Sequence, residues 1–104
     1  MKRILVLYGH PEDPEAFDRH YREVHVPLVE AMPHLHAFEY SDGGLEAADA
    51  ASPYHLVATL DFASGDALQT AMSSPEGVTA TADVANFATG GATVLTMDVA
   101  RAAG

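Results

Sequence analysis

The segment from Arg3 to Gly9 carries apolar side chains on both of its alternating sets of residues. The two sets are Ile4, Val6 and Tyr8 on one side, and Leu5 and Leu7 on the other. A strand with one face in water alternates apolar with polar residues, so this pattern predicts a strand that is covered on both faces. The fold must therefore place another layer on each side of this strand.

Turn and cap residues divide the rest of the chain into further elements. Asp13 is a good N-cap and Pro14 suits the first helical position, which predicts a helix from Pro14 onward. Pro27 removes one intrahelical hydrogen bond, so we expect this helix to end or kink close to His25. The remaining pattern predicts strands over 35–41, 54–62 and 92–99, and helical segments over 67–73 and 75–87.

The predicted order β-α-β-β-α-β is typical of one ferredoxin-like α+β domain over residues 1–104, with a four-stranded antiparallel sheet. Both helices of such a domain lie on one face of the sheet. The second face is then left apolar and uncovered, because the chain has no further element to place there. A second copy of the protein is the natural cover, which predicts a homodimer packed through the sheet faces.

Helical and strand periodicity assign side chains to faces. On the first helix, Phe17, Tyr21, Val24 and Leu28 form the expected core stripe. His20 and His25 fall at its two borders, about 140° apart on an ideal helix. On the strand over 54–62, alternation places His55 with Thr59 and Asp61, opposite Leu56, Leu60 and Phe62.

Composition excludes several functions. Fifteen acidic and five basic residues give a formal charge of -10, which repels nucleic acid and anionic membranes. The chain has no cysteine, so disulfides, thiolate metal sites and cysteine nucleophiles are excluded. The apolar run that follows Met1-Lys2-Arg3 is too short for a signal-peptide core or a membrane span. We therefore expect a cytoplasmic protein.

The chain also lacks the motifs of cofactor, metal and nucleophile sites. It has no Gly-x-Ser-x-Gly elbow and no glycine-rich phosphate loop, which predicts neither a nucleophilic serine nor a nucleotide cofactor. His34 and His36 would share one face of a strand, but no HExxH motif or acidic cluster accompanies them. We predict no metal and no cofactor.

Acid–base groups remain. His25 stands where the first helix is expected to end, and a helix C-terminus favours the protonated imidazolium. Tyr21 precedes it by one turn, so both side chains address one end of the sheet. The alternative is structural, with Tyr21 in the core and its hydroxyl at the rim, and His25 capping helix carbonyls.

Two motifs resemble the EthD family, named for ethyl tert-butyl ether degradation. Residues 17–28 match F-x-x-x-Y-x-x-x-H-x-P-L, and residues 74–87 match S-P-E-G…D-x-x-N-F. The resemblance implies a dimeric α/β barrel, a fold shared by muconolactone isomerases, antibiotic-biosynthesis monooxygenases, polyketide cyclases and some haem-binding peroxidases. Such a fold does not select a function.

Carried over residue by residue, the resemblance points to His25, Tyr21 and Asp83 as site residues. Asp83 either orients His25 as a carboxylate partner or satisfies a backbone group. We expect His55, Tyr8 and Phe62 to contact a bound ligand.

Several functions compete for this chain. The first is an isomerase, cyclase or proton-transfer catalyst acting on a small apolar molecule, aromatic or lactone-like, with His25 as the acid–base group. The second is a cofactor-free oxygenase, or an auxiliary protein of an oxygenase pathway. The third is a non-catalytic carrier or sensor, and haem binding is a minor fourth alternative.

Overall fold

A computed structural model describes all residues from 1 to 104, and its elements follow the predicted order. The strands are β1 (Lys2–Gly9), β2 (Ala37–Tyr40), β3 (Tyr54–Phe62) and β4 (Ala92–Asp98). The α-helices are α1 (Pro14–His20), α2 (Val26–Glu30), α3 (Gly65–Ser73) and α4 (Pro75–Phe87). A π-helical turn, η1 (Tyr21–His25), joins α1 to α2.

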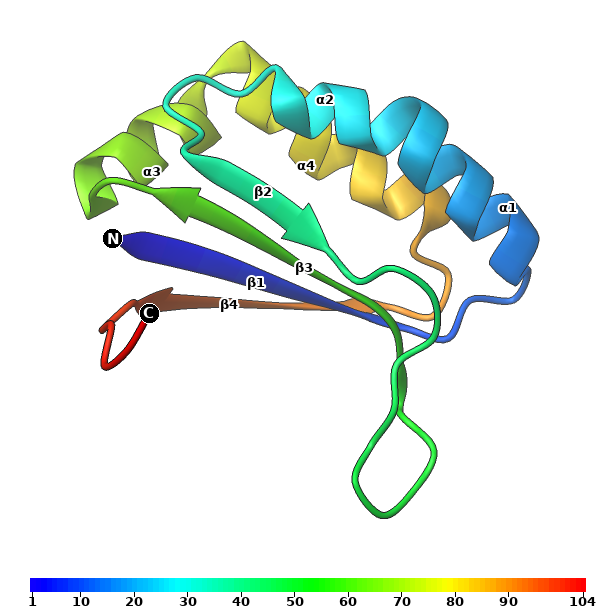
Figure 1. The fold of residues 1–104 in the computed structure, drawn as a ribbon. Coiled ribbons are helices and arrows are strands. Elements are labelled where there is room, and N and C mark those ends of the chain that lie inside the picture. Colours follow the sequence, from blue (N-terminus) through cyan, green and yellow to red (C-terminus); the bar gives the residue numbers. More distant parts are fainter.

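The four strands form one antiparallel sheet in the order β2-β3-β1-β4. All helices lie on one face of this sheet, and the other face is bare (Figure 1). The ferredoxin-like α+β fold predicted from the element order is therefore confirmed. No helix is both long enough and apolar enough to cross a membrane.

Side-chain caps fix the starts of the long helices. The Asp13 carboxylate accepts a hydrogen bond from the backbone N–H of Ala16 at 3.1 Å, which confirms the predicted N-cap of α1. Ser64 and Ser74 accept equivalent bonds at the starts of α3 and α4. Each hydroxyl or carboxylate satisfies one of the backbone donors that a helix start leaves unpaired.

The first helix does not end near His25, because η1 carries it on to Glu30, and the irregularity predicted there takes the form of a π turn. In η1 the N–H of Val26 donates to the carbonyl of Tyr21, five residues earlier. Pro27 has no N–H to donate, and in a regular α-helix its ring would press on the carbonyl of Glu23. The wider turn just before the proline keeps the backbone helical.

This wider turn also moves the buried stripe by one residue. Phe17 and Tyr21 are buried as predicted, but the stripe then continues through His25 and Val29. Val24, which was expected in the core, is 40% exposed. The π turn holds one residue more than an α turn, so every later side chain is advanced by one position. His25 therefore lies inside the core stripe and not at its border.

The bare face of the sheet is apolar along β1, as the sequence predicted, and mixed elsewhere, with Glu39, Thr59 and Thr93 also on it. Alternation along the paired strands places Leu5, Leu7, Val57, Leu95 and Met97 on this face. Leu95 is 52% and Met97 41% exposed. Arg3 and Asp61 add a paired charge, with Nε to Oδ1 at 2.7 Å and Nη2 to Oδ2 at 3.0 Å.

Candidate functional site

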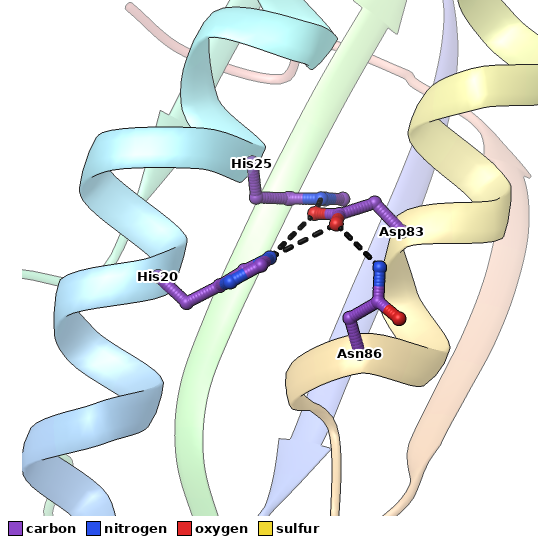
Figure 2. A network of polar contacts seen from close by, with 4 residues as sticks. All are labelled: His20, His25, Asp83 and Asn86. Atoms are coloured by element: carbon purple, nitrogen blue, oxygen red, sulfur yellow. Dashed lines mark hydrogen bonds and ion pairs between the residues drawn. The ribbon is translucent and has the colours of Figure 1, made fainter.

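The Asp83 carboxylate, on α4, is the centre of a polar network between α4 and the helix formed by α1 and η1 (Figure 2). His20 Nε2 lies 2.9 Å and 3.0 Å from the two carboxylate oxygens, and His25 Nδ1 lies 3.0 Å from Oδ2. Asn86, one turn further along α4, donates to Oδ1 at 3.0 Å. Asp83 is thus the carboxylate partner of His25, one of the two roles that the sequence left open.

His20 and His25 meet at this carboxylate because of the π turn. On an ideal α-helix, side chains five residues apart diverge by about 140°. A π turn closes its hydrogen bond from residue i to i+5, which brings such residues to nearly the same side. The predicted separation of the two histidines is therefore wrong, and both rings reach Asp83.

Burial dominates the electrostatics of His25, whose side chain is only 5% exposed. Burial lowers the pKa of His25, and the hydrogen bond and charge of Asp83 oppose that shift without reversing it. The expected helix C-terminus, which would have favoured the imidazolium, is absent because the helix continues. The neutral imidazole donates Nδ1–H to Asp83, and Nε2 is left with a free lone pair.

The carboxylate itself stays ionised. Burial alone would raise the pKa of Asp83, but hydrogen bonds from Asn86, His20 and His25 together lower it. An ionised acceptor fixes His25 in the Nδ1–H tautomer. The arrangement therefore produces a neutral base with a defined orientation.

His25 borders an apolar cavity of about 150 Å³ between the helices and the sheet. Tyr8 from β1 and Tyr21 from η1 share its wall, and most of the other lining side chains are aliphatic. The exposed residues Thr81 and Val94 also line it, so the cavity reaches the surface between α4 and β4. An engineered cavity of similar volume, about 150 Å³, holds a benzene molecule.

The phenol groups of Tyr8 and Tyr21 stay protonated at this wall. Burial raises the pKa of both hydroxyls, with a further contribution from Asp83 at Tyr8 and from Tyr8 at Tyr21. No residue of the chain hydrogen-bonds to either hydroxyl, yet no polar side-chain atom is both fully buried and unpaired. Each hydroxyl therefore retains contact with open space and is free to bind a ligand atom.

Packed aromatic rings hold these groups in position. The Tyr8 ring lies 5.4 Å from Phe17 and 5.4 Å from Phe87, and the His25 ring lies 4.8 Å from Phe87. Phe17 belongs to the first sequence motif and Phe87 to the second, and both are buried. They support the site from behind and are not part of the cavity wall.

A second hollow, a polar cleft of about 690 Å³, lies on the other side of Tyr21. Tyr40, Arg22 and His55 line it, and His55 Nε2 lies 2.7 Å from Asp18 Oδ1. Tyr21 lines both the polar cleft and the apolar cavity.

The predicted face of His55 is wrong. The register between β1 and β3 shifts by one residue at this point. Tyr8 pairs with Leu56, and the next residue, Gly9, pairs with Tyr54, so His55 has no partner on β1. Such a β-bulge turns the extra side chain out of strict alternation. The His55 ring consequently lies 4.8 Å from Phe17 on the helix side.

The structure brings together four of the predicted site residues and separates two. One cavity is lined by Tyr8, Tyr21 and His25, and Asp83 contacts His25 without lining the cavity. His55 lines the neighbouring cleft, and Phe62 is fully buried in the core beside neither space. No group of three or more His, Cys, Asp or Glu side chains is arranged to hold a metal ion.

Sequence reasoning missed His20 and Asn86. Asn86 belongs to the D-x-x-N-F stretch, where a spacing of three residues on a helix already places its amide next to Asp83. His20 had no such signal, because only the π turn brings it to the carboxylate.

Comparison with known proteins identifies the family. Residues 9–91 match the family model described as the EthD domain. A relative is the uncharacterized 11.0 kDa protein in the thcB-thcC intergenic region of Rhodococcus erythropolis, which is 44% identical over 99 residues, 94% of each chain. The chain therefore belongs to the EthD family.

Solved structures agree with this assignment. An EthD family protein from Bacillus halodurans has a TM-score of 0.89 at 28% identity, covering 96% of this chain and 99% of that one. A dimeric ferredoxin-like protein from Thermobifida fusca has a TM-score of 0.70 at 16% identity over 94% and 90%. SnoaB from Streptomyces nogalater, a cofactor-independent oxygenase, has a TM-score of 0.65 at 12% identity over 96% and 92%. The latter two show the shared fold alone.

Proposed function

We propose that this EthD-family protein binds a small apolar molecule in the cavity beside His25 and moves a proton on it, as an isomerase or cyclase does. One observation carries the proposal. An apolar cavity is lined both by a buried imidazole anchored by Asp83 and by Tyr21, whose hydroxyl has no partner in the chain. A site built only for packing has no need of either group.

The roles follow from the protonation states. Neutral His25 accepts a proton at Nε2 from a carbon next to a carbonyl group of the substrate. Asp83 holds the ring in place and stabilises the imidazolium that forms. The Tyr21 hydroxyl donates to the carbonyl oxygen, where negative charge develops. Where the substrate ring has a double bond next to that carbon, return of the proton to the far end of the double bond completes an isomerisation.

The cavity sets the size and polarity of the substrate. A volume of about 150 Å³ suits one unsubstituted or lightly substituted ring. Aliphatic walls exclude water, which strengthens each hydrogen bond made inside. The substrate is therefore a neutral single-ring carbonyl compound, such as a lactone or cyclic ketone.

Exchange of the α-protons of cyclopentanone with D2O, followed by proton NMR, tests this proposal. We expect the wild-type protein to accelerate the exchange, His25→Gln to abolish the acceleration, and Tyr21→Phe to reduce it by about a hundredfold. His34→Gln, at an exposed position outside the cavity, is the matched control. Equal acceleration by wild type and His25→Gln would contradict the proposal. Binding of the ketone without any acceleration would favour a carrier or sensor.

A cofactor-free oxygenase is the second candidate. Removal of a proton by His25 inside an apolar cavity would leave an electron-rich anion, the kind of molecule that can itself reduce oxygen. The fold neighbour SnoaB is described as a cofactor-independent oxygenase, and at 12% identity it supports this reading by analogy only. Oxygen consumption with the candidate substrate, measured with an electrode, distinguishes the two reactions.

We also propose that the protein is a homodimer in which the two bare sheet faces pack against each other. The apolar side chains of this face support it, and so does the fold neighbour from Thermobifida fusca, which is described as dimeric. A sheet-face interface of standard size hides about 800 Å² per subunit. Light scattering should give twice the 11.0 kDa chain mass at micromolar concentration, and a stable monomer would contradict this arrangement.

A further inference from the structure

We propose that the cavity takes a single-ring phenol or enol and holds it as its anion, with the oxygen between the hydroxyls of Tyr8 and Tyr21 and the proton on His25. This inference rests on the proposed function and extends its ligand from a neutral carbonyl compound to the oxygen anion that His25 forms from an enol or a phenol. It assigns Tyr8 a direct contact with the charged oxygen of the ligand.

The hydrogen-bonding groups of the wall define the complementary ligand. The phenol groups of Tyr8 and Tyr21 are free donors, and burial keeps both protonated. His25 offers only an acceptor, because Nδ1–H is already bound to Asp83. Apart from Thr81 at the rim, the other lining residues are apolar. The matching ligand therefore brings one acidic hydrogen and one oxygen that accepts two hydrogen bonds.

The two tyrosines are neighbours that line the same cavity. Their ring centroids lie 5.7 Å apart with planes at 77°, and Tyr21 lies 5.3 Å from the His25 ring. In a cavity of about 150 Å³, one aromatic ring contacts all three side chains at once. Neighbouring Phe17 packs on both tyrosines, which limits their freedom to turn away.

The ionisation step balances within the site. The O–H bond of the ligand breaks, its proton passes to His25 Nε2, and the electron pair stays on the oxygen. The new imidazolium lies against the Asp83 carboxylate, which His20 and Asn86 also contact. No carboxylate lines the cavity itself, and the Asp83 charge that acts on the Tyr8 hydroxyl is paired with the His25 imidazolium once the proton has moved.

Fluorine NMR with two probes of matched shape tests the proposal. The probes are 4-fluorophenol and 4-fluorotoluene, which differ only in a hydroxyl against a methyl group, and the fluorine shift of the phenol reports its ionisation. We expect the wild-type protein to bind 4-fluorophenol at least about tenfold more tightly than 4-fluorotoluene, with the shift of the phenolate.

Tyr8→Phe and Tyr21→Phe should each weaken 4-fluorophenol binding by about tenfold and leave 4-fluorotoluene binding unchanged. Tyr40→Phe is the control, because Tyr40 contacts Tyr21 but does not line the cavity. His25→Gln should bind the phenol in its neutral form. Melting curves by circular dichroism confirm that each variant is folded, and Tyr21→Phe alone decides the outcome if Tyr8→Phe does not fold.

The outcomes separate the two proposals. Wild-type affinity for 4-fluorophenol in the folded tyrosine variants, or a bound shift typical of the neutral phenol, would overturn the anion site. Equal affinity of the wild-type protein for both probes would also overturn it, while the apolar cavity of the proposed function would stand. Binding of neither probe to the wild-type protein would overturn both.

Discussion

Two of the three histidine–carboxylate pairs in the protein, one at Asp83 and one at Asp18, have similar distances and differ in burial. His25 and Asp83 lie 3.0 Å apart with side chains 5% and 6% exposed. His55 and Asp18 lie closer, at 2.7 Å, with side chains 18% and 40% exposed. The shorter contact thus belongs to the pair that water reaches, so the distance alone does not show which pair matters to the protein.

The difference lies in what else each carboxylate can bind. At Asp18 water replaces the histidine at little cost, and exposed pairs of this kind contribute about 0–1 kcal/mol. Asp83 is the acceptor for His20, His25 and Asn86, and there is little water to replace it. Removing Asp83 therefore leaves buried donors without a partner, which costs more than the bonds themselves contribute.

The largest expected effect is that of Asp83→Asn. The amide keeps the shape of the carboxylate but turns one acceptor into a donor, which faces His20 and either His25 or Asn86. We expect a loss of about 2 to 3 kcal/mol in the free energy of unfolding, measured by urea denaturation. A loss no larger than that of a surface substitution would remove the distinction between the two pairs.

The pH dependence of stability is the next effect. The pKa of His25 lies below 6.5 in the folded protein, so near that pH the unfolded chain binds a proton that the folded chain does not. Stability is therefore retained above the ordinary pKa of 6.5 and declines as the pH falls toward the folded value. For one proton the slope is at most about 1.4 kcal/mol per pH unit.

Urea denaturation across pH 5 to 8 would measure this decline, and His25→Gln should remove it. A separate loss should begin below the ordinary pKa of 3.8 and persist in His25→Gln, because the folded state lowers the pKa of Asp83. Wild type and His25→Gln with the same profile between pH 5 and 8 would show that His25 titrates as it does in the unfolded chain.

The smallest expected effect is that of Asp18→Asn. His55 keeps an amide oxygen as a partner, and the half-exposed position admits water. We expect a change within about 0.5 kcal/mol by the same denaturation assay, and unchanged binding of 4-fluorophenol. A loss in the free energy of unfolding close to that of Asp83→Asn would mean that the exposed pair of His55 and Asp18 stabilises the protein as strongly as the buried pair of His25 and Asp83.

The sequence was sufficient for the architecture and for part of the site. The caps at Asp13 and Ser74 predicted where two helices begin. The strand at 3–9, apolar on both sides, predicted the sheet and its bare face. The family motif added Asp83, which no local pattern had connected to His25. These features are visible because each depends on residues next to one another or on an unbroken period.

The errors about the site have a common physical cause. The π turn at 21–25 adds one residue to a helix, and the bulge at His55 adds one residue to a strand. Periodicity assigns faces by counting at a fixed interval, so one extra residue misplaces every side chain after it in the helix and the bulged one in the strand. Val24, His25 and His55 were misassigned for this reason, and His20, which precedes the turn, was wrongly separated from His25.

The π turn also bears on how relatives of this protein should be aligned. A homologue whose first helix is regular throughout would need one residue fewer between the counterparts of Phe17 and Val29 to bury the same positions. A gap at that point of an alignment would mark the loss of the geometry that joins both histidines to Asp83. This would hold even where the alignment still matches a tyrosine and histidines to Tyr21, His20 and His25. Helix length, and not motif identity alone, is therefore the feature by which to transfer a function from one member to another.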